Sequence, residues 1–372
     1  PSLVYPGKNS IRFKKKRDTL LHTLYERGII DSLTFSLATE EPLPDAAGTM
    51  PSLAPHLVSW FALTHPGERI KTTINPLLQK NVTAIINSHQ RELENNLIYN
   101  SAAIVVRVDD GAVLAYVGNC TIPDSTGNYC RDVDIIRSVR STGSILKPFL
   151  YAGLLSAGEM LPDELIADVP TRFQGFRPEN SDFSYRGAVP AGDALARSLN
   201  IPAVRMLQRF TEERFLRLLS RVGFTSFSKP ASYYGLSLIL GGGEASLWEL
   251  SGAYASMARV EKQCYEKATY TSRDWHMPVF TAEPQPMPGA SDPDPALSAP
   301  AIWCTYEALL RVNRPETETG WQYFGSAPTV AWKTGTSFGY RDAWAIGTTP
   351  TEVIGVWAGN ADGEGRPGLT GI

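Results

Sequence analysis

The alternation of apolar and polar residues predicts β-strands near both ends of the chain. Apolar runs at residues 102–108 and 112–117 flank Asp109-Asp110-Gly111, a turn signal that predicts a β-hairpin. Three further strand patterns follow late, at residues 330–332, 343–347 and 352–357. The early and late strands are expected to pair in one antiparallel sheet, which the late strands complete and helices flank. The pattern therefore predicts an α/β fold of the α+β type.

Helical periodicity fills the middle of the chain. It predicts helices at residues 77–94 and 301–312. Another helix is predicted after Gly143, where apolar residues recur at helical spacing: Ile145, Leu146, Phe149, Leu150, Leu154 and Leu155. Residues 277–300 are polar and rich in proline, which predicts a surface loop.

Residues 1–57 differ in character from the rest. Lys14-Lys15-Lys16-Arg17 leads into apolar positions that predict an amphipathic helix: Leu20, Leu21, Leu24 and Ile29 or Ile30. The basic run is interpreted as a solvated helix face, with membrane contact as the alternative. Proline and glycine between residues 42 and 51 indicate a linker, so the predicted domains are residues 1–57 and 58–372.

Ser144 and Lys147 form the first candidate catalytic pair. Residues three apart on a helix are neighbours, so the Lys147 amine can take the proton of the Ser144 hydroxyl, making Ser144 a nucleophile without a histidine. At a helix N-terminus, Ser144 would also lie beside unpaired backbone N–H groups. The same spacing recurs at Ser226 and Lys229, but the turn-like sequence there predicts a loop.

Two further motifs add to this pair. Ser198 and Asn200 supply a hydroxyl that can pass a proton to a leaving amine and an amide that can hold the base and the substrate. Lys333-Thr334-Gly335-Thr336 continues a predicted strand, whose alternation puts Lys333 and Thr334 on opposite faces. Gly335 is expected to let a substrate backbone approach closely.

The three motifs in this order resemble the signature of penicillin-binding proteins and serine β-lactamases. Longer stretches resemble the class A, bifunctional penicillin-binding proteins, and within them type 1C: residues 70–79, 137–149, 241–247, 332–347 and 357–367. Two departures stand out. The family usually has aspartate at the position of Asn75, and many relatives have an acidic residue at the position of Leu199.

The resemblance implies a transpeptidase fold with a five-stranded antiparallel sheet and a helical subdomain. It implies a D,D-transpeptidase that cross-links peptidoglycan stem peptides ending in D-Ala-D-Ala, with a carboxypeptidase side activity and acylation by β-lactams. The catalytic residues would be Ser144, Lys147, Ser198, Asn200 and Lys333. Thr334, Gly335 and Thr336 would bind substrate, and backbone N–H groups of Ser144 and Thr336 would hold the oxyanion.

The resemblance also places the protein in the bacterial periplasm, within a parent anchored to the inner membrane. That parent would carry a glycosyltransferase domain, of which residues 1–57 are the C-terminal remnant. No apolar run approaches the roughly 18–20 residues of a spanning helix. Because the sequence opens at Pro1 without an initiator methionine and ends at Ile372 in a glycine-rich stretch, we expect an excised fragment.

Other function classes are disfavoured or remain as alternatives. A net charge of −3 means that basic residues are not in excess, which disfavours nucleic-acid binding. The histidines are scattered and the cysteines lack metal-ligand spacing, so neither metal nor cofactor is expected. Cys120 and Cys130 flank a turn-rich loop, either as a disulfide or as two buried thiols.

A serine β-lactamase is one alternative function. It would need a second base to activate water, but Glu212 and Glu213 are expected to start a helix. A non-catalytic module that binds stem peptides or β-lactams is the other.

Overall fold

The computed structural model describes residues 7–44, 52–123, 129–173, 175–281, 295–312 and 329–371. The chain divides into two compact units, Pro1–Ser52 and Leu53–Ile372. This boundary lies five residues before the predicted one, because His56 and Leu57 are buried and Leu57 belongs to the main core of the second unit. The helix that contains them, α3 (Pro55–Thr64), therefore belongs to the second unit.

The first unit consists of two helices, α1 (Ser10–Glu26) and α2 (Ser32–Glu40). The basic run lies on α1 as predicted, but the helix ends before Ile29. The Asp31 side chain accepts a hydrogen bond from Thr34 N–H and so begins α2. Neither helix has a buried residue among those described.

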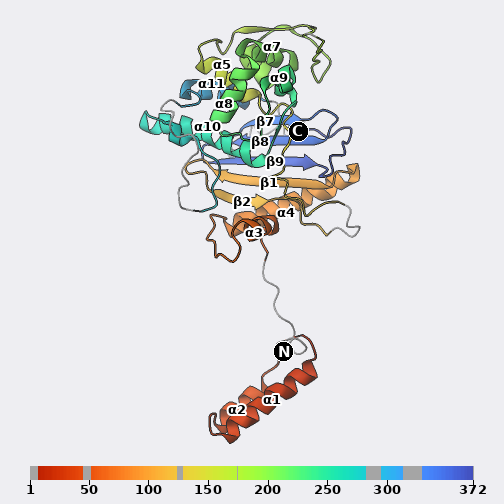
Figure 1. The fold of residues 1–372 in the computed structure, drawn as a ribbon, viewed down its shortest axis with the longest axis vertical. Helices are drawn as coiled ribbons and strands as arrows, with labels where there is room; N and C mark the ends of the chain where they lie inside the picture. Colours follow the sequence, from red (N-terminus) through yellow and green to blue (C-terminus); the bar gives the residue numbers. More distant parts are fainter. Residues whose placement is uncertain are drawn as a thin grey trace. The chain divides into compact units, whose positions relative to one another are not determined.

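The second unit is built around a five-stranded antiparallel sheet in the order β2-β1-β9-β8-β7 (Figure 1). Its strands are β1 (Asn100–Arg107), β2 (Val113–Val117), β7 (Ala331–Thr336), β8 (Asp342–Thr348) and β9 (Glu352–Gly359). The late strands complete the sheet as predicted, because β9 pairs with β1 along its length, from Asn100 opposite Gly359 to Arg107 opposite Glu352. Short strands make two further pairs: β3 (Arg140–Ser141) with β6 (Glu244–Ala245), and β4 (Leu165–Asp168) with β5 (Gly187–Pro190).

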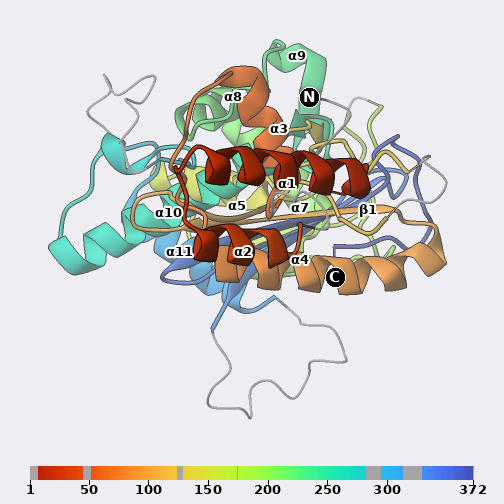
Figure 2. The ribbon, with the colours of Figure 1, turned by 90° about the horizontal axis from the view of Figure 1, so that it is seen from below.

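Helices cover both faces of this sheet, which explains why β1 is buried from Asn100 to Val106. Side chains alternate along a strand, so Ala103 packs with Ile86 of α4 (Pro76–Leu93), whereas Ile104 belongs to the main core with Leu247 of α10 (Leu247–Lys267). Figure 2 shows α4 extending beside β1, with which it is in contact. Asn75 caps α4 by accepting hydrogen bonds from the Leu77 and Leu78 N–H groups, a role for which asparagine and aspartate are equally suited.

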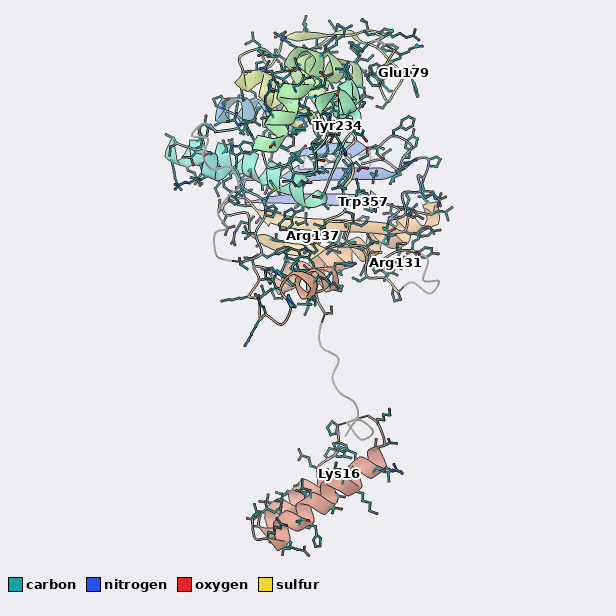
Figure 3. All side chains as sticks on the ribbon, in the orientation of Figure 1. Lys16, Arg131, Arg137, Glu179, Tyr234 and Trp357 are labelled. Carbon is teal, nitrogen blue, oxygen red and sulfur yellow. The ribbon has the colours of Figure 1, made fainter. Side chains whose placement is uncertain are left out.

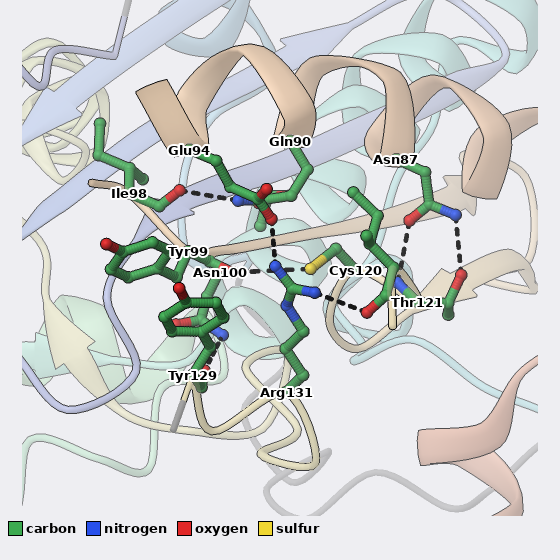
Figure 4. A network of polar contacts seen from close by, with 12 residues as sticks. Asn87, Gln90, Glu94, Ile98, Tyr99, Asn100, Cys120, Thr121, Tyr129 and Arg131 are labelled. Carbon is green, nitrogen blue, oxygen red and sulfur yellow. Dashed lines mark hydrogen bonds and ion pairs between the residues drawn. The ribbon is translucent and has the colours of Figure 1, made fainter. Parts of the chain in front are cut away.

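A polar network ties α4 to the segment after β2 (Figure 4). Gln90 donates to the Ile98 carbonyl at 2.8 Å, and Arg131 forms an ion pair with Glu94. Cys120 is buried, and its thiol lies 3.6 Å from the Tyr99 carbonyl. All four cysteines are free thiols. Cys130 is exposed, so neither a disulfide nor a pair of buried thiols is present.

The remaining helices form a helical part beyond the β7 end of the sheet (Figure 1). They are α5 (Lys147–Ser156), α6 (Ala191–Ala196), α7 (Asn200–Phe210), α8 (Glu212–Arg221), α9 (Ala231–Tyr234) and α11 (Ala299–Leu310). The last of these confirms the helix predicted at residues 301–312 and packs on α5, α6, α10 and β7. Most of the predicted loop at residues 277–300 lies outside the described residues.

Within the described ranges, every helix is too short or too polar to cross a membrane.

Candidate active site

Ser144 lies in a turn immediately before α5 rather than inside the helix, because α5 begins at Lys147. Backbone bonds from Ile145 N–H to the Thr142 carbonyl (3.1 Å) and from Lys147 N–H to the Ser144 carbonyl (3.3 Å) join residues three apart. Such 3₁₀-type turns align residues i and i+3, so the expected proximity of Ser144 and Lys147 survives this correction. Ser144 is half-buried and Lys147 is buried.

Three neighbouring elements hold the serine turn in place. Pairing of β3 with β6 fixes the residues that lead into the turn. The buried Trp344 indole N–H donates to the carbonyl of one of them, Ser141, at 2.8 Å. The Tyr254 hydroxyl, from α10, donates to the Ile145 carbonyl at 2.8 Å. Gly143 has φ +51°, and a Cβ there would lie 2.5 Å from the Thr336 carbonyl oxygen, so only glycine fits against β7.

The Lys147 amine is held by the second motif. Its Nζ donates to the Ser198 carbonyl and to Asn200 Oδ1, both at 2.7 Å, and lies 3.4 Å from Ser198 Oγ. A neutral amine has two hydrogens, which these two short bonds occupy, so its lone pair remains to accept a proton. Among the described residues, no hydrogen bond joins this amine to the Ser144 hydroxyl.

Ser198 connects the two lysines of the site. It lies between α6 and α7 with φ +56°, a conformation that is uncommon for a residue with a side chain. Lys333 donates to Ser198 Oγ at 2.8 Å and to the Thr334 carbonyl at 2.6 Å. Hydrogen bonds therefore join Lys147, Ser198, Asn200 and Lys333, and Ser144 lies in the turn that leads directly into Lys147.

Burial changes the ionisation of both lysines. It holds the Lys147 pKa well below its usual range, and the charge of Lys333 lowers that pKa further. Burial alone lowers the pKa of Lys333 to about 7. Because both causes act on Lys147, its amine is suited to act as a base at neutral pH.

The β7 edge strand presents a backbone donor to the same region. Ser337 N–H donates to the Asp342 carbonyl of β8 at 2.9 Å, so by alternation the Thr336 N–H points to the free edge. Thr334 and Thr336 side chains share the face opposite Lys333, where Gly371 N–H donates to the Thr336 hydroxyl at 3.3 Å.

The expectation for Gly335 needs correction. A Cβ at Gly335 would lie 2.9 Å from the Thr142 carbonyl oxygen and 3.2 Å from Ile145 N. The backbone that approaches this glycine is therefore the chain's own serine turn. Gly335 allows the first and third motifs to meet, which its sequence context alone could not distinguish from contact with a substrate.

Residues outside the three motifs behave in two ways. The repeated Ser226 pattern is a loop, as expected, and its hydroxyl bonds to Glu249 at 3.0 Å. Glu212 and Glu213 begin α8, as expected. Asp182 acts within its own turn by accepting from Ser184 N–H at 3.1 Å. Asn180 reaches beyond this turn, because its side-chain oxygen accepts a hydrogen bond from Asn200 N–H of α7 at 2.9 Å.

Among the residues that the structure describes, no group of three or more His, Cys, Asp or Glu side chains is placed to hold a metal ion.

Comparison with known proteins identifies the family. Residues 101–361 match the family described as "Penicillin binding protein transpeptidase domain". This match covers most of the chain, which therefore belongs to the penicillin-binding protein transpeptidase family, as the motifs predicted.

One relative indicates the branch within that family. Penicillin-binding protein 1C of Escherichia coli is 32% identical over 372 residues, which are 100% of this chain and 45% of that protein. The match supports the predicted type 1C resemblance, and the chain spans less than half the length of that relative.

Solved structures share the fold. Penicillin-binding protein 1A of Haemophilus influenzae has a TM-score of 0.67 at 17% identity, covering 100% of this chain and 75% of that one. The PonA1 protein of Mycobacterium tuberculosis, solved in complex with penicillin V, has a TM-score of 0.59 at 20% identity, covering 84% of each chain. At these identities the comparison concerns the fold alone.

Proposed function

We propose that this chain is a serine-type D,D-transpeptidase that cross-links peptidoglycan stem peptides and is acylated by β-lactams. The observation that carries the proposal is the buried arrangement of Lys147 and Lys333 around Ser198, beside the turn that bears Ser144. A buried amine with a strongly lowered pKa next to a hydroxyl nucleophile is what acyl transfer without a histidine requires.

In the acylation step, Ser144 Oγ attacks the carbonyl between the two terminal D-alanines and its proton passes to neutral Lys147. The tetrahedral oxyanion is held by the N–H groups of Ser144 and Thr336, and loss of one such donor typically costs about 3–4 kcal/mol. The C–N bond then breaks, and Ser198 relays the proton from Lys147 to the departing D-alanine. Asn200 orients the Lys147 amine and the substrate amide.

Substrate recognition is assigned to the β7 edge. The Thr334 and Thr336 hydroxyls bind the terminal carboxylate, which has to replace the contact between Gly371 and the Thr336 hydroxyl, and the Lys333 charge adds to this binding from the opposite face of the strand. An amine from a second stem peptide then takes the acyl group and completes the cross-link. Water in its place gives the carboxypeptidase side reaction.

The cellular setting is inferred from the relatives. We infer a periplasmic domain of a parent protein that is anchored to the inner membrane and carries a glycosyltransferase domain. Residues 1–52, rather than the predicted 1–57, would be the remnant of that domain.

Intact-protein mass spectrometry after incubation with benzylpenicillin tests the proposal. A stable single adduct is expected for the wild type and for Ser226→Ala, and no adduct for Ser144→Ala. An adduct that persists in Ser144→Ala would contradict the assignment of the nucleophile.

The time course and a second substrate separate the alternatives. An adduct lost within seconds would indicate a β-lactamase. Failure to release D-alanine from a stem peptide, with no adduct, would indicate a binding module without chemistry.

A further inference from the structure

A buried polar chain lies behind the Ser198–Asn200 motif, and the catalytic scheme does not use it. Asn180 is 1% exposed and Asp168 is fully buried, at the end of β4. Burying a carboxylate and an amide is costly unless each is fully hydrogen-bonded, so their partners show what the arrangement accomplishes.

Asn180 caps helix α7 from a distance. Its Oδ1 accepts hydrogen bonds from Asn200 N–H at 2.9 Å and Ile201 N–H at 3.4 Å, the first N–H groups of the helix. These groups lack partners within the helix, and Leu199 at the N-cap position has no side chain that can accept them. Asn180 therefore does what a capping side chain at position 199 would otherwise do.

Asp168 fixes which way the Asn180 amide points. Asn180 Nδ2 donates to Asp168 Oδ1 and to the Ser184 carbonyl, both at 2.8 Å. Both partners can only accept, so the Asn180 oxygen has to face α7. The other carboxylate oxygen of Asp168 accepts from Arg186 N–H at 3.0 Å, with the Arg186 guanidinium 3.9 Å away.

The adjacent residue orients the Asn200 side chain. Asn200 Nδ2 donates to the Glu179 carbonyl at 2.7 Å, which leaves Asn200 Oδ1 directed at Lys147 Nζ. Glu179 lies in the helical part of the second unit (Figure 3). Residues 179 and 180 thus hold both the backbone and the side chain of Asn200.

We infer that Asn180, oriented by Asp168, is a positioning residue that fixes Asn200 and Ser198 against the Lys147 amine. The inference rests on the proposed acyl transfer at Ser144. It identifies a fourth element of the site, between the first and second motifs, that acts through the second motif without touching the reacting atoms.

Penicillin acylation of Asn180→Ala across pH tests this role. We expect the plateau rate constant, per folded molecule, to fall by roughly tenfold or more, because two N–H groups lose their acceptor and Asn200 loses its fixed position. The Asn200 oxygen accepts a hydrogen bond from Lys147 Nζ and so favours the charged form of this amine. Loss of this contact should therefore lower the Lys147 pKa and move the acid limb of the profile to lower pH. Lys333, the charged group that acts on the Lys147 amine, is still present in Asn180→Ala.

Asn119→Ala is the matched control. Asn119 is also fully buried and hydrogen-bonded to backbone, with Cys120 N–H at 2.9 Å and the Val133 carbonyl at 3.1 Å, but it lies beyond β2. We expect it to lower the thermal midpoint while the acylation profile stays that of the wild type. An Asn180→Ala profile with the same shape and plateau as Asn119→Ala would overturn the inference.

Hydrogen exchange provides a readout that does not depend on the chemistry. Deuterium uptake of a peptide spanning residues 199–206 should rise in Asn180→Ala and stay unchanged in Asn119→Ala. Unchanged uptake in Asn180→Ala would overturn the inference even if the wild type is acylated. A wild type that is never acylated would count against the proposed function instead, and the exchange result would still decide whether Asn180 fixes α7.

Discussion

Replacing Lys333 by methionine isolates the electrostatic part of the proposed mechanism. Methionine keeps an unbranched chain in the buried position and removes the charge that faces Lys147. Ser198 Oγ lies 2.8 Å from Lys333 Nζ and 3.4 Å from Lys147 Nζ. The two nitrogens are therefore at most roughly 6 Å apart, where two unit charges repel by about 2.8 kcal/mol at an effective dielectric constant of ~20.

That repulsion sets the expected change in pH dependence. A charged Lys333 disfavours a proton on the Lys147 amine and so lowers the Lys147 pKa beyond the effect of burial. Because the Lys333 pKa is about 7, this charge is present where the acid limb of acylation lies. In Lys333→Met, burial still lowers the Lys147 pKa, but the repulsion is gone. We expect the midpoint of the acid limb to move to higher pH.

The assay is the second-order rate constant for acylation by a fluorescent penicillin, measured across pH. The plateau should also fall, because Lys333 is proposed to bind the substrate carboxylate, and the midpoint separates the two effects. Lys229→Met, at the repeated serine–lysine spacing, is the control and should leave the profile unchanged. A midpoint that stays in place or moves to lower pH in Lys333→Met would refute the electrostatic argument.

Lys333→Met and two further substitutions test stability. The Lys333 pKa is lowered to about 7, so between about pH 7 and 10.5 the unfolded chain keeps a proton that the folded chain has released. The free energy of unfolding therefore rises with pH in this range. Lys333→Met removes the buried amine and should stabilise the fold by up to about 5 kcal/mol at pH 7, measured as a higher thermal midpoint. Trp344→Phe removes the donor to the carbonyl before the serine turn and should cost about 1–3 kcal/mol and slow acylation, whereas Trp303→Phe on the exposed face of α11 should do neither. Leu57→Ala should destabilise the second unit by about 2–5 kcal/mol in calorimetry, and the exposed Leu37→Ala should leave that transition unchanged.

The sheet and the main site residues were predictable because short-range patterns carry them. Alternation identifies β7, β8 and β9, and turn residues identify the hairpin of β1 and β2. The three motifs contain the residues that meet at Lys147 and Lys333, although their meeting depends on contacts between residues 53 and 135 positions apart in the sequence.

The features that were missed depend on tertiary contacts. Asn180 sits in a sequence typical of a turn, and nothing local shows that its amide reaches α7 twenty residues later. Gly335 looks the same whether a substrate or the chain's own turn approaches it. The predicted domain boundary lies after Leu57, because no local pattern shows that Leu57 packs in the core of the second unit.

The pairing of β1 with β9 has a consequence for biosynthesis. Arg107 of β1 pairs with Glu352 of β9. At ribosomal rates of 5–20 residues per second, β9 is therefore synthesised roughly 12–50 s after β1. During that time the β1 edge that β9 later covers is unpaired, and exposed strand edges of this kind invite association between chains. The contact order of this sheet therefore favours slow folding, and a nascent chain halted before residue 352 should be a substrate for chaperones.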